Sequence, residues 1–299
     1  MKYKKTIILL ALVVFLLSIA GVSASEIDNT IASENANTIE LSTDNDIIED
    51  NLQTSEENEA LASTDYDEAI AQTDTEVLGA DSATYSNLAE EISHSGNITL
   101  THKNYTYDED AIAITISEAN KVIDGNGAVI DMNGSTIRAF HVSASGVTIK
   151  NLTIKNANYD GDGGAIYFTS SATSGTVTNC NFTGNNATGD GGAIRMSSGT
   201  VTNCNFVNNS ARYGGVIKFE RMGIVTKCNF TNSQAAIGGA IFFNDYSTGN
   251  VINCNFTNNQ ASSGGAIEFG GSGSVTNCNF TGNTATSYGG AVTLMRLVL

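Results

Sequence analysis

The sequence of 299 residues contains no proline and no tryptophan, so no segment of it is proline-rich, and it is poor in positive charge. Fourteen lysine and arginine residues stand against 31 aspartate and glutamate residues, which gives a formal net charge of −17. After residue 80 the imbalance nearly disappears, because that part holds 15 acidic and 11 basic residues. A near-neutral folded part gives no electrostatic reason to bind nucleic acid, and we exclude that class of partner.

Long apolar runs are also missing, except at the N-terminus. Three lysines among the first five residues precede the apolar stretch Ile7–Ala20, and Val22–Ala24 supplies the small residues of a cleavage site. The pattern predicts a signal peptide over residues 1–25 and therefore a secreted or cell-surface protein. Since a membrane span needs about 20 apolar residues, an uncleaved signal is the one route to membrane attachment that the sequence offers.

Basic residues are wholly absent from residues 26–80, which hold 16 aspartates and glutamates. Such one-sided charge with low hydrophobicity is typical of disordered chain, because too little surface can be buried to offset the ordering entropy. We predict an acidic disordered linker over residues 26–82. It is either a spacer that attracts cations or a solvated linker with no specific partner.

The repeats in the rest of the chain lack any apolar stripe of helical period, which excludes a helical solenoid. That part of the chain is instead built from two sequence motifs that recur about every 24 residues. One contains GGAI or a close variant, and the other, VTNCNFTGN, begins at Val177. Repeats of this period indicate a solenoid. Alternating apolar and polar residues in both motifs predict three short strands and three bends per turn. The predicted fold class is therefore all-β, a parallel β-helix over residues 83–299.

Two positions of the VTNCNF motif, the cysteine and the phenylalanine, are expected to face the core and to form columns of stacked side chains, or ladders, along the solenoid. Parallel neighbours about 4.8 Å apart point the same way, which does not suit a disulfide, so we expect reduced thiols. The ladder residues are Cys180, Cys204, Cys228, Cys254, Cys278, Phe182, Phe206, Phe230, Phe256 and Phe280.

The residue before each of these cysteines is expected to form a bend, because the step from Val201 to Cys204 breaks the period of two. Asn203 tolerates the left-handed conformation that a bend needs, and Lys227 is the exception in its column. In the GGAI strands the column between the two apolar positions has no common chemistry and is predicted to face solvent. Its members are Tyr167, Arg195, Lys218, Phe242, Glu268 and Thr293.

The two ends of the predicted stack differ. Thr84–Gly96 reads as a short amphipathic helix with Tyr85, Leu88 and Ile92 on one face, suited to covering the open N-terminal end. At the other end, the last repeat stops without a cap. Because solenoids normally carry terminal caps, we expect the sequence to be a fragment of a longer protein.

The pairing of GGAI with F-x-x-N in each repeat resembles the repeat of chlamydial polymorphic outer-membrane proteins. The third copy departs from the motif, with Ser233 in place of asparagine and Val216 in place of alanine. The layout as a whole resembles adhesin-like surface proteins of gut methanogenic archaea. The resemblance covers roughly residues 84–299 and implies a right-handed β-helix at a cell surface. The matching segments include Gly191–Ile194 with Phe182–Asn185, and Gly264–Ile267 with Phe256–Asn259.

A catalytic site is not evident, because glycoside hydrolysis needs a pair of clustered carboxylates. The predicted outward column holds one carboxylate, Glu268, which we interpret as a solvated surface residue. His94, His102 and His141 form no recognisable triad. Asp160, Asp162 and Asp190 could gather at successive turns and hold Ca²⁺, or they could be ordinary Gly-Asp-Gly turns.

We therefore interpret the chain as a non-catalytic adhesin-like β-helix that needs no cofactor and binds a surface glycan or protein. Two alternatives stay open. One is a polysaccharide lyase or hydrolase acting on acidic glycans, and the other is a purely structural stalk of the cell envelope.

Overall fold

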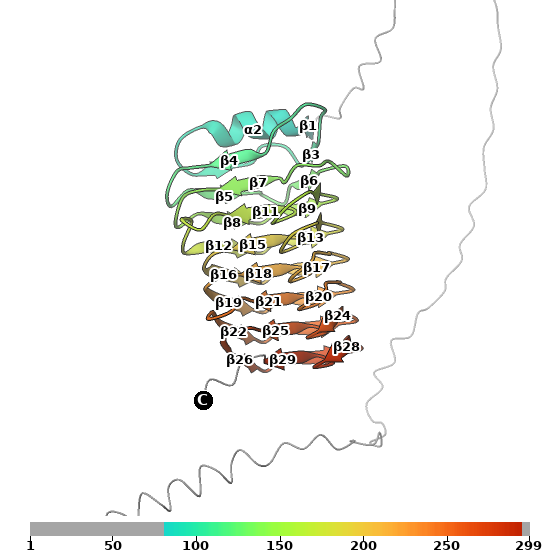
Figure 1. Ribbon diagram of the computed structural model, residues 1–299. Helices are drawn as coiled ribbons and strands as arrows, with labels where there is room; N and C mark the ends of the chain where they lie inside the picture. Colours follow the sequence, from blue (N-terminus) through green and yellow to red (C-terminus); the bar gives the residue numbers. More distant parts are fainter. Residues whose placement is uncertain (1–80, 295–299) are drawn as a thin grey trace, which may run out of the picture. The chain divides into compact units, whose positions relative to one another are not determined.

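The protein is a parallel β-solenoid closed at its N-terminal end by one short helix (Figure 1). A computed structural model describes residues 81–294. The predicted signal peptide and nearly all of the predicted acidic linker lie outside the described residues. Each turn contributes one strand to each of three parallel sheets, which confirms the predicted β-helix.

The first sheet has nine strands and carries the cysteine-to-phenylalanine segments. Its strands are β1 (Ser82–Thr84), β3 (Asn104–Thr106), β6 (Val129–Asp131), β9 (Thr153–Lys155), β13 (Asn181–Thr183), β17 (Asn205–Val207), β20 (Asn229–Thr231), β23 (Asn255–Thr257) and β27 (Asn279–Thr281).

The second sheet has eight strands and precedes the first sheet in each turn. Its strands are β2 (Ile98–Thr99), β5 (Val122–Asp124), β8 (Thr148–Lys150), β12 (Gly175–Thr178), β16 (Gly199–Thr202), β19 (Met222–Thr226), β22 (Thr248–Ile252) and β26 (Ser272–Thr276).

The third sheet also has eight strands and carries the GGAI segments. Its strands are β4 (Ile114–Ile116), β7 (Phe140–Val142), β11 (Ile166–Phe168), β15 (Ile194–Met196), β18 (Ile217–Phe219), β21 (Ile241–Phe243), β25 (Ile267–Phe269) and β29 (Val292–Leu294).

A fourth stack of chain, which the sequence did not predict, lies between the first and third sheets. It contains two short parallel pairs, joined along the stack by single bridges between neighbouring turns. The prediction of three segments per turn was therefore incomplete. The pairs are β10 (Asn158–Tyr159) with β14 (Asn186–Ala187), and β24 (Gln260–Ser263) with β28 (Thr284–Tyr288).

Phenylalanine ladders fill the interior because each strand pairs in register with its own repeat. Phe182, Phe206, Phe230, Phe256 and Phe280 stack along the first sheet with ring centroids 4.7 to 5.1 Å apart and planes within 11°. Offset stacking at this spacing adds to the gain from burying each ring. All of these rings are buried except that of Phe280, which is partly buried.

The cysteines form a second interior column, and all five are free thiols. Four are buried and Cys278 is partly exposed. The backbone N–H of Cys204 donates to Sγ of Cys228 at 3.4 Å, and the next pairs repeat the contact. Burial raises the pKa of Cys180 well above its usual value, as expected for a thiol without a cationic neighbour.

Two bends per turn place non-glycine residues in the left-handed region. Asn203 has φ of 54°, and Lys227 in the same column has the same φ. The asparagines of this column also bond to one another, as Asn203 Nδ2 donates to Oδ1 of Asn179 at 2.6 Å. A second left-handed column at Asn208 follows the first sheet. The sequence predicted the first bend and missed the second.

The asparagine of F-x-x-N is an interior residue. Asn209 is 1 % exposed, and its Nδ2 donates to the carbonyl oxygen of Phe182 in the previous turn at 3.0 Å. Its Oδ1 accepts from the backbone N–H of Asn185. Because a buried amide is stable only when its hydrogen bonds are satisfied, the motif is explained by this link between successive turns.

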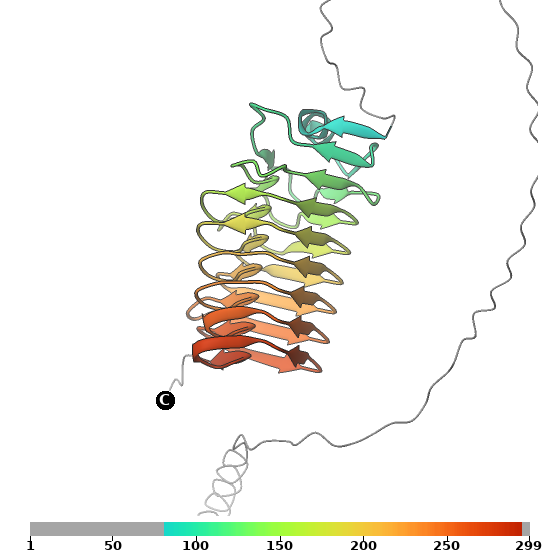
Figure 2. The same ribbon diagram turned by 90° about the vertical axis from the view of Figure 1, so that its right-hand side faces the viewer.

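Helix α2 (Tyr85–Ser93) lies across the first turns, and Figure 2 shows it nearly end-on beside β1. Thr84 caps its N-terminus in a capping box with Asn87, and its apolar face is buried. The predicted capping helix is therefore confirmed, although it ends before Gly96. Among residues 81–294, no helix is long and apolar enough to cross a membrane.

Candidate functional site

The outward column of the third sheet is a half-buried strip of aromatic and charged residues. We define this outer strip as His141, Tyr167, Arg195, Lys218, Phe242, Glu268 and Thr293, which pair in register. The prediction that this column faces solvent holds only in part: its other predicted members are half-buried, but Lys218 is 8 % exposed and Glu268 is 0 % exposed. The fourth stack lies against it, and Tyr213 from that stack packs on Phe242 with ring centroids 5.7 Å apart.

The N-terminal part of the outer strip is a stack of cations and rings. The guanidinium of Arg138 lies 4.0 Å from the ring centroid of Tyr159 and 4.4 Å from that of Tyr167. Arg195 lies 4.9 Å from the same Tyr167 ring, and His141 packs on it at 5.4 Å. Burial and the charge of Arg138 lower the pKa of His141. Cation–π contacts thus fix these side chains against one another.

The middle of the outer strip is an ion-pair network centred on Lys218. Its Nζ contacts carboxylate oxygens of Asp190 and Glu220, and Arg195 donates to the same Glu220 oxygen at 2.9 Å. Burial alone would raise the pKa of Glu220, but Lys218 and Arg195 outweigh it and hold that pKa below its usual value. Both carboxylates are therefore occupied by cations.

The C-terminal part contains a pocket of about 350 Å³. Tyr213, Phe242 and Glu268 are among the residues that line it. Ser263 Oγ donates to Oε2 of Glu268 at 2.8 Å, whereas Oε1 is buried without a partner in the described part of the chain. Burial raises the pKa of Glu268, and its hydrogen bonds only partly offset this. The pocket is lined by Tyr213, Lys218, Ile237, Phe242, Asn244, Asp245, Glu268 and Gly270.

The interpretation of Glu268 as a solvated residue was therefore wrong. The carboxyl group lies between Phe242 and Thr293, its neighbours in register, and the fourth stack covers it through Ser263. Sequence reasoning also missed Tyr213 and Asp245. A signal for Tyr213 was present, because it stands directly before GG where two earlier copies carry aspartate.

The aspartates proposed for Ca²⁺ are each engaged separately. Asp160 Oδ1 accepts from Thr188 Oγ1 at 2.6 Å, Asp162 Oδ1 accepts from the backbone N–H of Asp190, and Asp190 itself pairs with Lys218. Within residues 81–294, no group of three or more histidine, cysteine, aspartate or glutamate side chains is arranged to hold a metal ion. The contacts favour the turn interpretation.

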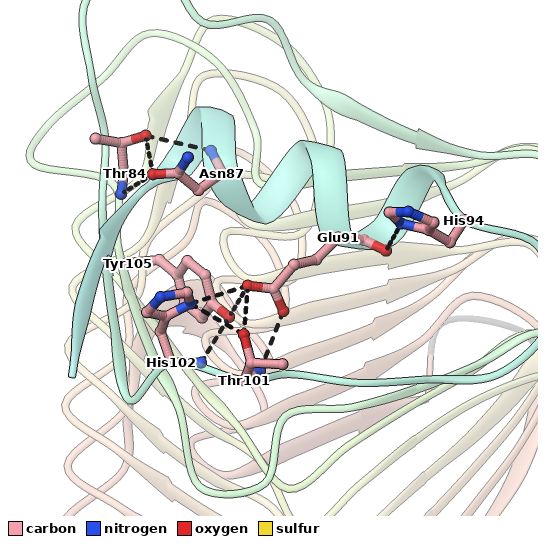
Figure 3. A network of polar contacts seen from close by, with 7 residues as sticks. All are labelled: Thr84, Asn87, Glu91, His94, Thr101, His102 and Tyr105. Atoms are coloured by element: carbon pink, nitrogen blue, oxygen red, sulfur yellow. Dashed lines mark hydrogen bonds and ion pairs between the residues drawn. The ribbon is translucent and has the colours of Figure 1, made fainter. Parts of the chain in front are cut away.

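Two of the three histidines, His94 and His102, lie at the capped end and not on the outer strip (Figure 3). Glu91 of α2 accepts hydrogen bonds from the backbone and hydroxyl groups of Thr101 and from Tyr105, and it contacts Nδ1 of His102 at 3.0 Å. Burial would raise the pKa of Glu91, but these hydrogen bonds together lower it. His94 contacts the carbonyl oxygen of Glu91. This network attaches the helix to the first turns, a structural role.

Comparison with known families identifies the solenoid. A family model described as "Right handed beta helix region" matches residues 136–295, which is more than half of the chain. The comparison with curated proteins gave no match. Neither did the comparison with solved structures. The match supports the fold and says nothing of adhesins or of outer-membrane protein repeats. The chain belongs to the right-handed β-helix family.

Proposed function

We propose that this protein is an exported, non-catalytic adhesin-like β-helix whose outer strip binds a glycan or protein at a surface. The observation that carries the proposal is the ordering of the strip. Its rings and charges are fixed by contacts with one another yet remain partly accessible along many turns. A rigid, varied face of this kind suits recognition, because little side-chain freedom is lost on binding.

The ion pairs that the carboxylates form with cations also support binding rather than catalysis. Asp190 and Glu220 are ion-paired to Lys218 and Arg195. A general acid must carry a proton at working pH, and a general base must be free to accept one. Lys218 and Arg195 lower the pKa of Glu220, so this carboxyl group suits neither role.

A second candidate function, hydrolysis or lysis of a polysaccharide, is favoured by one observation. Glu268 has a raised pKa and shares the 350 Å³ pocket with Asp245. Two carboxyl groups in different environments are the arrangement that glycosidases use for an acid and its partner. The candidate is weaker because Glu268 is covered by Ser263 and its neighbouring turns.

One screen separates the two candidates. The 299-residue chain is incubated with neutral, acidic and amino polysaccharides and with intact cells, with and without Ca²⁺. Retention and product release are measured on the same samples. We expect retention on at least one polysaccharide and no product. Reducing ends or unsaturated uronides that disappear in Glu268→Gln would establish the enzyme instead, and absence of both retention and product across glycans and cell surfaces would reject the binding proposal.

A further inference from the structure

The pocket of about 350 Å³ is lined by two different parts of the chain. Phe242 stands at the centre of β21 with its side chain outward. Tyr213 and Ile237 belong to the fourth stack, which precedes the third sheet in each turn. Asn244 and Asp245 follow β21 directly and line the pocket beyond the other end of the strand. The pocket therefore joins an aromatic and aliphatic side to a polar side.

The polar side offers hydrogen-bond acceptors. Asp245 is exposed, and among residues 81–294 no side chain pairs with its carboxylate or donates to it. Asn244 donates through Nδ2 to Glu220 at 2.7 Å, which leaves Oδ1 to accept from a ligand. Glu268 is 0 % exposed and takes no part in such contacts. A ligand with several hydroxyl groups suits this side, since a hydrogen bond to a carboxylate is stronger than one between neutral groups.

The other side offers flat apolar surface. The rings of Phe242 and Tyr213 lie with their centroids 5.7 Å apart and their planes tilted by 38°, and both residues are half-buried, as is Ile237. A pyranose ring carries C–H groups on its faces and hydroxyl groups at its edge, so it matches both sides of the pocket at once. The volume is at the lower end for ligand pockets and suits one sugar unit.

The rings of the pocket disfavour a cationic sugar. Nζ of Lys218 lies 5.8 Å from the ring centroid of Phe242. The guanidinium of Arg212 lies 4.9 Å from the ring centroid of Tyr213. Because each ring already faces a cation, a second cation brought onto either ring would be repelled.

An acidic sugar is disfavoured as well. Lys218 is the one cation that lines the pocket, and Asp190 and Glu220 already neutralise it. An acidic group would also meet the unpaired carboxylate of Asp245, and like charges at close range repel. A neutral sugar avoids both costs.

We propose that this pocket binds one neutral hexopyranose unit of a glycan, with a C–H face of the sugar on Phe242 and its hydroxyl groups donating to Asp245 and Asn244. The inference rests on the proposed function, and it assigns a ligand class to one part of the outer strip.

The test is an NMR titration of the full chain at pH 7 with the methyl glycosides of D-glucose, D-galactose and D-mannose. The uronic acid and the 2-amino-2-deoxy counterpart of each sugar are titrated in parallel. We expect at least one neutral glycoside to bind with a dissociation constant on the order of 1 mM, as suits a ligand of about a dozen non-hydrogen atoms. Its two charged counterparts should bind at least about fivefold more weakly.

Two variants locate the binding. Phe242→Ala should weaken it at least about tenfold, because it removes the aromatic surface. Asp245→Asn keeps the shape of the side chain and loses its charge, and it should weaken binding about fivefold. Ile112→Ala and Asp110→Asn are the matched controls, because both residues are exposed and stand before β4, and both variants should bind as the wild type does. A thermal melt shows that each variant is folded. Since Asp245 is exposed, its variant decides the question if Phe242→Ala unfolds.

The proposal is overturned if no neutral glycoside binds, if a charged counterpart binds as tightly as the neutral sugar, or if Asp245→Asn leaves the affinity unchanged. If the screen above shows retention and no neutral glycoside binds, the assignment of the pocket fails and the proposed function stands. If a neutral glycoside binds as expected and the screen shows no retention on any polysaccharide or cell, the pocket stands and the proposed function fails.

Discussion

The interior ladders and the outer strip occupy opposite faces of the same strands, yet they follow different rules. Phe219, Phe243 and Phe269 point inward from β18, β21 and β25 and stack on one another within 5.2 Å. Between them, Lys218, Phe242 and Glu268 point outward and share no chemistry.

The difference follows from what each side chain meets. An interior residue meets the equivalent residue of the next turn, so apolar residue types that stack well on themselves recur along each column. An outward residue meets both its neighbour in register and the fourth stack, whose sequence changes from turn to turn. The variable face is therefore where a specific partner can be recognised.

The largest expected effect is on the interior side. Phe206→Ala removes a fully buried ring stacked between two others, at 5.1 and 4.9 Å. We expect the free energy of unfolding to fall by about 3–5 kcal/mol, measured by chemical denaturation. A loss below about 1 kcal/mol would contradict the ladder as the main source of stability.

A smaller effect is expected for Arg195→Ala in the outer strip. A solvent-facing arginine would contribute less than about 0.5 kcal/mol, but Arg195 pairs with Glu220 and packs on Tyr167. We expect a loss of about 1–2 kcal/mol. Arg221→Ala, an exposed neighbour, is the control and should be nearly neutral. Equal effects of the two changes would show that the strip is not an ordered network.

Two glutamates of the same region should respond oppositely to pH. The pKa of Glu220 is lowered in the fold, so its stabilising contribution is present at neutral pH and is lost as the pH falls through that pKa. The pKa of Glu268 is raised, so its contribution is present below the usual value of 4.5 and is lost as the pH rises through the raised pKa.

Accordingly, Glu220→Gln should destabilise the protein at pH 7, and Glu268→Gln should stabilise it or leave it unchanged. Both differences should shrink in acid. Thermal unfolding at several pH values measures them. The same sign for both variants at pH 7 would contradict the assigned environments.

The smallest expected effect is at a bend. Lys227 adopts φ of 54° where the other turns have asparagine, and it interrupts the asparagine ladder between Asn203 and Asn253. Lys227→Asn should stabilise the protein by about 0.5–1 kcal/mol, because asparagine adopts this conformation at lower cost. Lys227→Ala is the comparison and should not stabilise it.

The interior could be predicted from the sequence because each position there repeats. A column such as Phe182 to Phe280 is visible in the chain, and period-two alternation then fixes the side that it faces. The capping helix was predictable from its apolar face and its terminus at Thr84. Asn209 also recurs, as the asparagine of F-x-x-N, but its inward position depends on a bend at Asn208 that breaks the alternation.

The outer strip could not be predicted in the same way. Alternation shows that Glu268 points away from the core, but it does not show that another segment covers that face. The covering segment carries no apolar period, and its role depends on individual contacts such as Ser263 with Glu268 and Asp190 with Lys218. Asp190 was identified as a candidate Ca²⁺ ligand, although the side chain that it contacts is Lys218 of β18, the neighbour of the strand that Asp190 precedes.

The claim that the outer strip is the recognition surface is tested most directly by making alanine substitutions on two different outer surfaces. Tyr167→Ala with Phe242→Ala alters the outer strip, and Asn229→Ala with Asn255→Ala alters the exposed face of the first sheet. Retention of each full-length variant on the polysaccharide or cell surface that holds the wild type is measured after a thermal melt confirms folding. We predict at least a tenfold loss of affinity for the first pair, as expected for removing aromatic anchors, and little change for the second. Equal losses, or a loss confined to the asparagine pair, would contradict the outer strip as the recognition surface.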